Sequence, residues 1–161
     1  MLDATDPQRE LRHVLATLAY RATRSLQDPP EEFATLRLSN TTRTPLEIVS
    51  HMADLLEWAL RRARAEPGPR ADTSGEWSRE VARFYEAARA LDAHLASSAP
   101  LGCAAEKLLQ GPLADALTHV GQLAMLRGLA GSPVRGESYF DADIRPGQVG
   151  PERADSSAAC D

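Results

Sequence analysis

The chain has 161 residues, a length that suits a single domain with one hydrophobic core. Apolar residues make up 43% and charged residues 25%, which are ordinary globular values and exclude a disordered or fibrous chain. The net charge is −5 and basic residues do not cluster with aromatic ones, so we expect no binding to nucleic acid. The densest basic group, Arg61, Arg62 and Arg64, is expected to close a helix, where positive charge complements the helix dipole.

The cysteines and the N-terminus indicate the compartment. Cys103 and Cys160 occupy unrelated positions, which is typical of reduced thiols in a cytoplasmic protein, with a disulfide between them as the alternative. No apolar run is long enough to span a membrane, and the first residues lack the basic and apolar regions of a signal peptide. We therefore expect a cytoplasmic protein with no membrane partner.

Apolar residues recur every three or four positions in four separate stretches, and no convincing strand alternation occurs. The first helix is predicted over residues 6–27, where Asp6-Pro7 opens it and Pro29-Pro30 closes it. A loop from 30 to 43 follows. Its length would permit a crossover connection in place of a tight hairpin.

The second helix is predicted to begin at Thr44, because Pro45 suits the first helical position and Glu47 completes a capping box. It should end near residue 66, before the Pro-Gly-Pro at 67–69.

The third helix, predicted over 74–97, has the most regular apolar seam, which includes Trp77 and Phe84. A short helical piece is expected around 104–109. Gly111-Pro112 is then expected to start the fourth helix, which should end near residue 130, before Gly131 and Pro133.

Four helices of about twenty residues predict an all-α fold, a four-helix bundle. The predicted domain covers residues 6–145, and Tyr139, Phe140 and Ile144 could lay a short irregular arm across it. Residues 146–161 are expected to form a disordered tail. A homodimer is expected, since bundles with a spare apolar edge often pair.

Asp115 and His119 are the most informative pair in the chain. They are four residues apart, so on a helix they project from one face and could bind one ion. His51 lies beside the apolar stripe of the second helix. If the two helices face each other, His51, Asp115 and His119 would form a site of two histidines and one carboxylate with open positions for water or substrate.

Each of these residues also has a simpler interpretation. His51 could be a hydrogen-bonded histidine at the edge of the core. Asp115 could be an acid of the first helical turn, favoured by the helix dipole, if Pro112 begins that helix. Asp54 could orient His51 or belong to a solvated acidic face, the interpretation that we favour.

Other chemistry-bearing residues give weaker signals. His13 and His94 match no partner spacing, and Cys103 is interpreted as structural. Gly121 is expected to permit close approach of another helix beside the site. The sequence contains no Gly-rich phosphate loop and no cysteine pair at zinc-finger spacing, and it identifies no catalytic residue.

The residues from about 11 to 130 resemble the DinB/YfiT-like superfamily of metal-dependent bacterial bundles. The family pattern has one histidine on the second helix and two histidines four apart on the fourth, the last followed by one residue and Gly-Gln. His51 matches the first histidine, and His119-Val-Gly-Gln122 matches the last with its trailing dipeptide. Asp115 stands where the family has its other histidine, and a carboxylate can replace an imidazole for Zn, Mn, Fe or Ni.

The resemblance implies a four-helix bundle and a metal-dependent activity on a small-molecule substrate. Characterised relatives include thiol-dependent S-transferases and a maleylpyruvate isomerase that uses a low-molecular-weight thiol. We therefore expect a divalent metal, and with it thiol transfer or metal-assisted hydrolysis. The alternative is a metal-free bundle that serves as a binding or dimerisation module in stress response, and an Asp115 that points to solvent would favour it.

Overall fold

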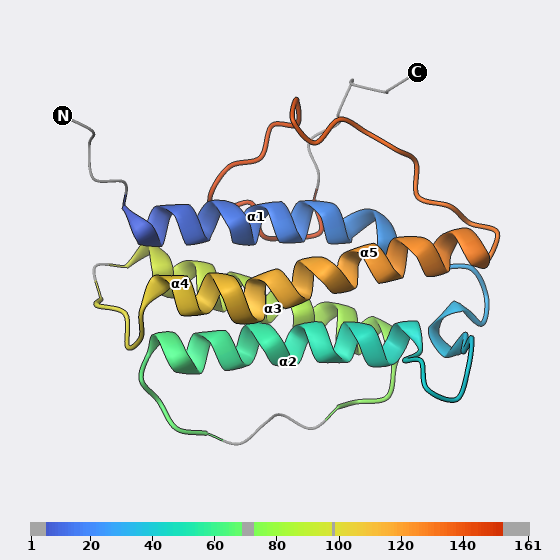
Figure 1. Ribbon diagram of the computed structural model, residues 1–161, viewed down its shortest axis with the longest axis horizontal. Coiled ribbons are helices and arrows are strands. Elements are labelled where there is room, and N and C mark those ends of the chain that lie inside the picture. The colour runs from blue at the N-terminus through green and yellow to red at the C-terminus, as the bar shows by residue number, and fades with distance from the viewer. Residues whose placement is uncertain (1–5, 69–72, 98, 153–161) are drawn as a thin grey trace.

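The computed structural model of the protein describes residues 6–68, 73–97 and 99–152, and its regular elements in these ranges are all helical. Four long helices lie alongside one another as a bundle (Figure 1). In chain order the elements are α1 (Pro7–Leu26), the 3₁₀ turn η1 (Phe33–Thr35), α2 (Pro45–Ala63), α3 (Trp77–Ala96), α4 (Ala105–Leu108), the π-helical turn η2 (Leu109–Leu113) and α5 (Ala114–Leu129). The predicted four-helix bundle is confirmed at this level.

The predicted starts of α1 and α2 are confirmed by their caps. The side chain of Asp6 accepts a hydrogen bond from the amide of Gln8 at 3.0 Å, and the first position of α1 is a proline. Thr44 accepts a hydrogen bond from the amide of Glu47 at 3.2 Å, while the Glu47 carboxylate accepts one from the amide of Thr44 at 2.7 Å. This reciprocal pair fixes where α2 begins, and so fixes the height of His51 along the bundle.

The fourth long helix begins earlier than expected. Its backbone continues from α4 through η2 into α5, and both Leu109 and Leu113 have helical dihedral angles. Gly111-Pro112 therefore does not start the helix. Pro112 has no amide hydrogen to donate, and the wider π turn accommodates it without ending the helix.

Two contacts set the direction of α1 relative to α3. Arg12, near the start of α1, forms an ion pair with Asp92, near the end of α3, at 2.9 Å. Thr23, near the end of α1, shares a hydrogen bond of 2.9 Å with the hydroxyl of Tyr85. The two helices are therefore antiparallel.

The contacts between α2 and α3 show the opposite relation. Arg83 donates to the carbonyl of Ser50 at 3.1 Å, and Nε2 of His94 donates to the carbonyl of Ala63 at 3.2 Å. The two helices are parallel, so the connection between them links opposite ends of the bundle (Figure 1). The crossover that the sequence suggested between the first two helices lies instead between the second and the third.

α5 packs against both α1 and α2. Near its C-terminal end, Arg127 donates to the carbonyls of Gln27 and Asp28 at 2.9 and 3.2 Å, just beyond α1. α5 is therefore parallel to α1 and antiparallel to α2 (Figure 1). The two helices bring His51 of α2 close to Asp115 and His119 of α5.

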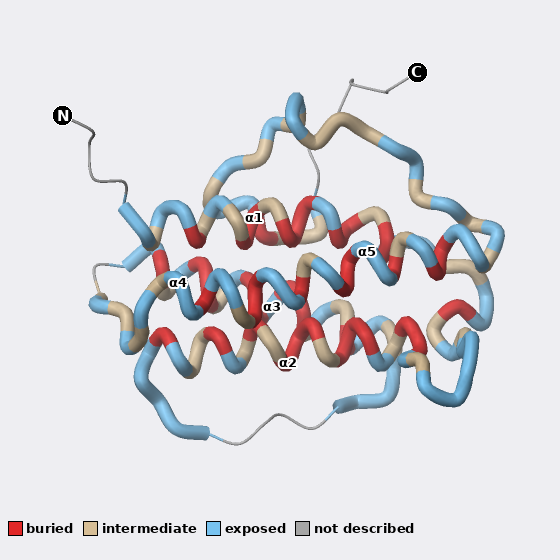
Figure 2. Tube along the Cα trace, viewed as in Figure 1, coloured by how far each residue is buried: buried red, intermediate tan, exposed pale blue. Residues whose placement is uncertain are grey.

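Buried residues lie on the sides of the helices that face the bundle interior (Figure 2). The largest fully buried apolar side chains are Phe33, Phe84, Leu15, Leu18, Ile48, Met52, Leu56, Leu91, Leu113 and Leu123. Within the described ranges, no helix combines the length and the apolar character that crossing a bilayer requires.

The predicted arm after α5 contacts α1 through Tyr139. Its ring lies edge-on to Tyr20, with centroids 6.4 Å apart, and the guanidinium of Arg21 lies 4.1 Å from the ring centroid. Ile144 packs against the core. Phe140 is 97% exposed, so it does not help to hold the arm on the bundle as expected.

Residues 146–152, which were expected to be disordered, make contacts with the bundle. Val149 is only 5% exposed and belongs to the core cluster, and the carbonyl of Pro151 accepts a hydrogen bond from Gln27 at 3.2 Å. An apolar side chain that reaches the core holds this segment on the bundle, so the packed domain extends past 145. The remainder of the expected tail, 153–161, lies outside the described residues.

Candidate metal centre

His51, Asp115 and His119 come together between α2 and α5, as the sequence predicted. One ligand atom of each lies within 4.8 Å of the others. His51 is on the second turn of α2, and the other two residues are one turn apart on α5. The i, i+4 spacing gives α5 two ligands on one face, and the antiparallel packing of α2 adds the third.

The carboxylate of Asp115 lies between the two imidazoles. Its Oδ2 is 3.3 Å from Nε2 of His51, and its Oδ1 is 3.4 Å from Nε2 of His119. The two rings meet edge to face, with centroids 4.9 Å apart. The Nε2 atoms and the carboxylate therefore point into one small volume.

Gln122 orients the second imidazole. Nδ1 of His119 donates a hydrogen bond to Oε1 of Gln122 at 2.8 Å. A neutral imidazole that carries its proton on Nδ1 presents a lone pair at Nε2, so His119 and Asp115 face each other as two acceptors. Such an arrangement calls for a cation, and a metal-binding histidine is oriented by a partner of this kind.

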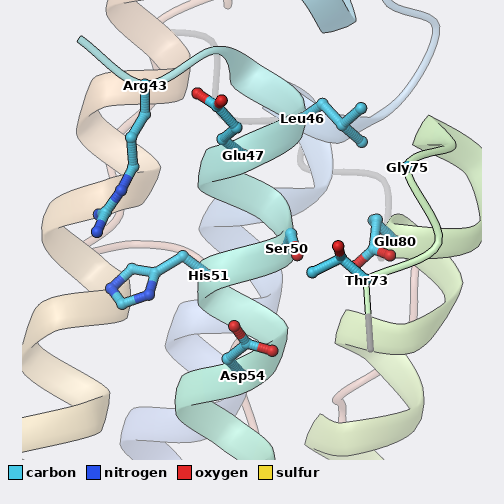
Figure 3. A pocket seen from close by; sticks show the side chains of 9 residues that line it. All are labelled: Arg43, Leu46, Glu47, Ser50, His51, Asp54, Thr73, Gly75 and Glu80. Atoms are coloured by element: carbon cyan, nitrogen blue, oxygen red, sulfur yellow. The ribbon is translucent and has the colours of Figure 1, made fainter. Parts of the chain in front are cut away.

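Arg43 supplies a positive charge beside these acceptors. Its Nη1 donates to Nε2 of His119 at a long 3.4 Å. Figure 3 shows Arg43 and His51 on the same side of α2, with the guanidinium directed toward the imidazole. The sequence prediction missed Arg43 because the residue precedes the helix cap, where helical periodicity gives no signal.

Burial lowers the pKa of His51 below its ordinary value, and the charge of Arg43 acts in the same direction. The hydrogen bond with Asp115 opposes this effect but does not outweigh it. His51 is therefore neutral at neutral pH, which is the form that binds a metal ion.

Asp115 is neither buried nor turned away from the histidines. Its side chain is 48% exposed, against 22% for His51 and 7% for His119, yet both its oxygens face the imidazoles. The alternative of a dipole-stabilised acid in the first turn fails, because the helix that carries Asp115 begins at Ala105. The half-exposed carboxylate leaves one side of the site open to solvent.

Asp54 has a different role from either expectation. It is buried and forms an ion pair with Arg83 of α3. Arg83 also lies 3.2 Å from a carboxylate oxygen of Glu57 and 3.0 Å from one of Glu80. This cluster joins α2 to α3. Glu80 is three residues from Arg83 on the same helix, but Asp54 and Glu57 are too far from Arg83 in the sequence for a spacing rule to identify them.

Gly121 does not permit the close helix approach that the sequence suggested. It is exposed, and a Cβ built there would meet no atom within 4 Å. Residues two positions apart on a helix point to different sides. Because His119 points into the bundle, Gly121 points away from it. Cys103 is half-buried against the core and free, which agrees with its structural interpretation, while Cys160 lies outside the described residues.

Hollows adjoin the centre on the side of His51 and on the side of His119. The first, bordered by His51, Ser50 and the acidic residues Glu47, Asp54 and Glu80, has a volume of about 260 Å³ (Figure 3). The second lies on the side of His119 and has a volume of about 510 Å³. Volumes of this order suit small molecules.

The donor set fits a divalent first-row metal. Two imidazoles and one carboxylate are ligands that Zn, Fe, Mn and Ni accept, and three protein ligands leave at least one coordination position for water or substrate. Comparison of the chain with models of protein families, with curated proteins and with solved structures finds no match in any of the three, so the likeness to DinB/YfiT-like bundles rests on the residues described above.

Proposed function

We propose that the protein is a metal-dependent enzyme that acts on a small molecule at the centre formed by His51, Asp115 and His119. The observation that carries this proposal is the convergence of three ligand atoms within 4.8 Å of one another from two helices. The half-exposed carboxylate and the adjoining hollows support an open site and not a closed structural one.

Each residue of the centre would have its own role. The two imidazoles and the carboxylate would hold the ion, and Gln122 would keep Nε2 of His119 free of a proton. A bound divalent metal supplies Lewis acidity that lowers the pKa of a water or a thiol at its open position. The DinB-like pattern favours a low-molecular-weight thiol and S-transfer, with metal-assisted hydrolysis as the other reaction.

The competing proposal is a metal-free bundle that serves as a binding or dimerisation module in stress response. The hydrogen bond from Arg43 to His119 favours it, because the guanidinium partly satisfies the acceptors without an ion. Metal binding therefore decides between the two proposals.

We expect the untagged protein to bind Co²⁺, and we expect the bound Co²⁺ to coordinate an added thiol. The test uses protein with Cys103 and Cys160 changed to Ser, so that sulfur reaches the cobalt only from added N-acetylcysteine. Thiolate-to-cobalt charge-transfer absorption should appear with the thiol, because the site has an open position. N-acetylserine, which has a hydroxyl in place of the thiol, is the control and should give no such band.

Each contrary result has a definite meaning. If cobalt fails to bind, the metal-free module is the better account. If cobalt binds and the thiol leaves its visible spectrum unchanged, S-transfer is excluded and hydrolysis becomes the proposed reaction.

A further inference from the structure

The hollow on the His119 side differs in charge from the chain as a whole. The protein carries a net charge of −5, yet the residues that line this hollow, all of them within the described part of the chain, include one arginine and no acidic residue. Arg43 also lines the neighbouring hollow in Figure 3, but there three acidic residues, Glu47, Asp54 and Glu80, line it as well. The surface beside His119 is therefore the one that would accept an anion.

Arg43 has an unusual partner for an arginine, an imidazole nitrogen. Arg12 and Arg37 form ion pairs with Asp92 and Glu47 at 2.9 and 2.7 Å. Within the described residues, Arg43 has no such ion pair, and its hydrogen bond to an imidazole nitrogen at 3.4 Å is long. An exposed guanidinium in this position retains donors for a bound anion.

Gln122 offers a second donor on the same hollow. Its Oε1 accepts the hydrogen bond from Nδ1 of His119, so the amide nitrogen is the group left for another partner. The amide nitrogen has no partner in the described chain and belongs to a residue that lines the hollow. Arg43 and Gln122 thus place donors on either side of His119, one from the start of α2 and one from α5.

Apolar side chains complete the lining. Ile48 and Leu126 are buried, whereas Leu38 is 48% exposed and Met125 is 57% exposed. Covering the exposed pair would remove apolar surface from water, which favours a ligand with an apolar body.

We propose that this hollow is a binding subsite for a small organic anion with an apolar body, whose charged group is held by Arg43 and Gln122 beside the metal centre. This inference deepens the proposed function, on which it rests, by naming the class of substrate. The anionic group lies next to His119, so it orients the rest of the molecule at the open side of the centre.

The test measures binding of 4-fluorobenzoate by ¹⁹F NMR titration to zinc-treated protein, with neutral 4-fluorobenzamide as the comparison ligand. Arg43→Gln removes the charge and keeps a polar side chain. Arg62→Gln makes the same change at an exposed position near the other end of α2 and serves as the matched control. Circular dichroism checks that the variants fold, and elemental analysis gives the zinc content of each sample.

Fluorobenzoate should bind more tightly than fluorobenzamide, and Arg43→Gln should weaken it by about tenfold to a hundredfold, the size expected for a charge-assisted hydrogen bond. Arg62→Gln should leave the affinity unchanged. Equal binding of the two ligands, or equal loss in the two variants, overturns the subsite. If the protein holds no zinc and fluorobenzoate binding still depends on Arg43, the subsite is supported and the metal enzyme is contradicted. If the protein holds zinc and fluorobenzoate binding does not depend on Arg43, the metal centre is supported and the subsite is contradicted.

Discussion

Changing His51 or His119 to Ala should weaken zinc binding by more than about a hundredfold. Changes to residues that only orient metal ligands already weaken binding by about tenfold to a hundredfold, and loss of a ligand from a site with three protein ligands should exceed that. A competition titration against a chromophoric chelator gives both affinities. His13→Ala is the matched control, because His13 is exposed on α1 and belongs to a different hollow.

The same titration at falling pH adds a second readout. Protons compete with zinc for the imidazoles, so affinity should fall with acidification. Burial lowers the pKa of His51, so its share of this loss should occur below the ordinary histidine value of about 6.5. Zinc affinity that is unchanged in His51→Ala or His119→Ala would remove that residue from the site.

Phe84→Asp should unfold the protein. Phe84 is fully buried in α3, and its ring lies edge-on to that of Tyr85, with centroids 5.1 Å apart. Losing a buried phenylalanine costs about 3–5 kcal/mol, and an unpaired buried carboxylate adds to that, while a whole domain is stable by about 5–15 kcal/mol. Far-ultraviolet circular dichroism and thermal melting measure the effect.

Ala82→Asp provides the control on the same helix, since Ala82 is exposed and the substitution carries only a propensity cost below about 1 kcal/mol. Trp77→Asp should be milder than Phe84→Asp, because Trp77 is only half-buried at the start of α3. A Phe84→Asp protein that melts at the wild-type temperature would contradict the placement of α3 in the core.

Most of the helices could be predicted because their signals are local. The Thr44 capping box and the apolar repeat of α3 depend on residues a few positions apart. Pro112 misled the prediction, because proline marks a helix start far more often than a π turn inside a helix. The crossover was misplaced because a loop's length says that it can span the bundle, not that it does.

The same distinction between local and distant signals applies to the metal centre. The i, i+4 spacing of Asp115 and His119 is a local pattern, and the approach of His51 followed from the bundle architecture. The roles of Arg43 and Asp54 depend on contacts with distant parts of the chain, which no spacing reveals.

We propose that Asp115 acts as a charged metal ligand, and the zinc content of an Asp115 series is the decisive measurement. Untagged wild-type protein, Asp115→His and Asp115→Asn are loaded with zinc, desalted and measured by elemental analysis. We predict about one zinc per chain in wild-type protein and in Asp115→His, which supplies a third imidazole, and much less in Asp115→Asn, which keeps the shape without the charge. Equal zinc in wild-type protein and Asp115→Asn, or none in either, would contradict the metal centre.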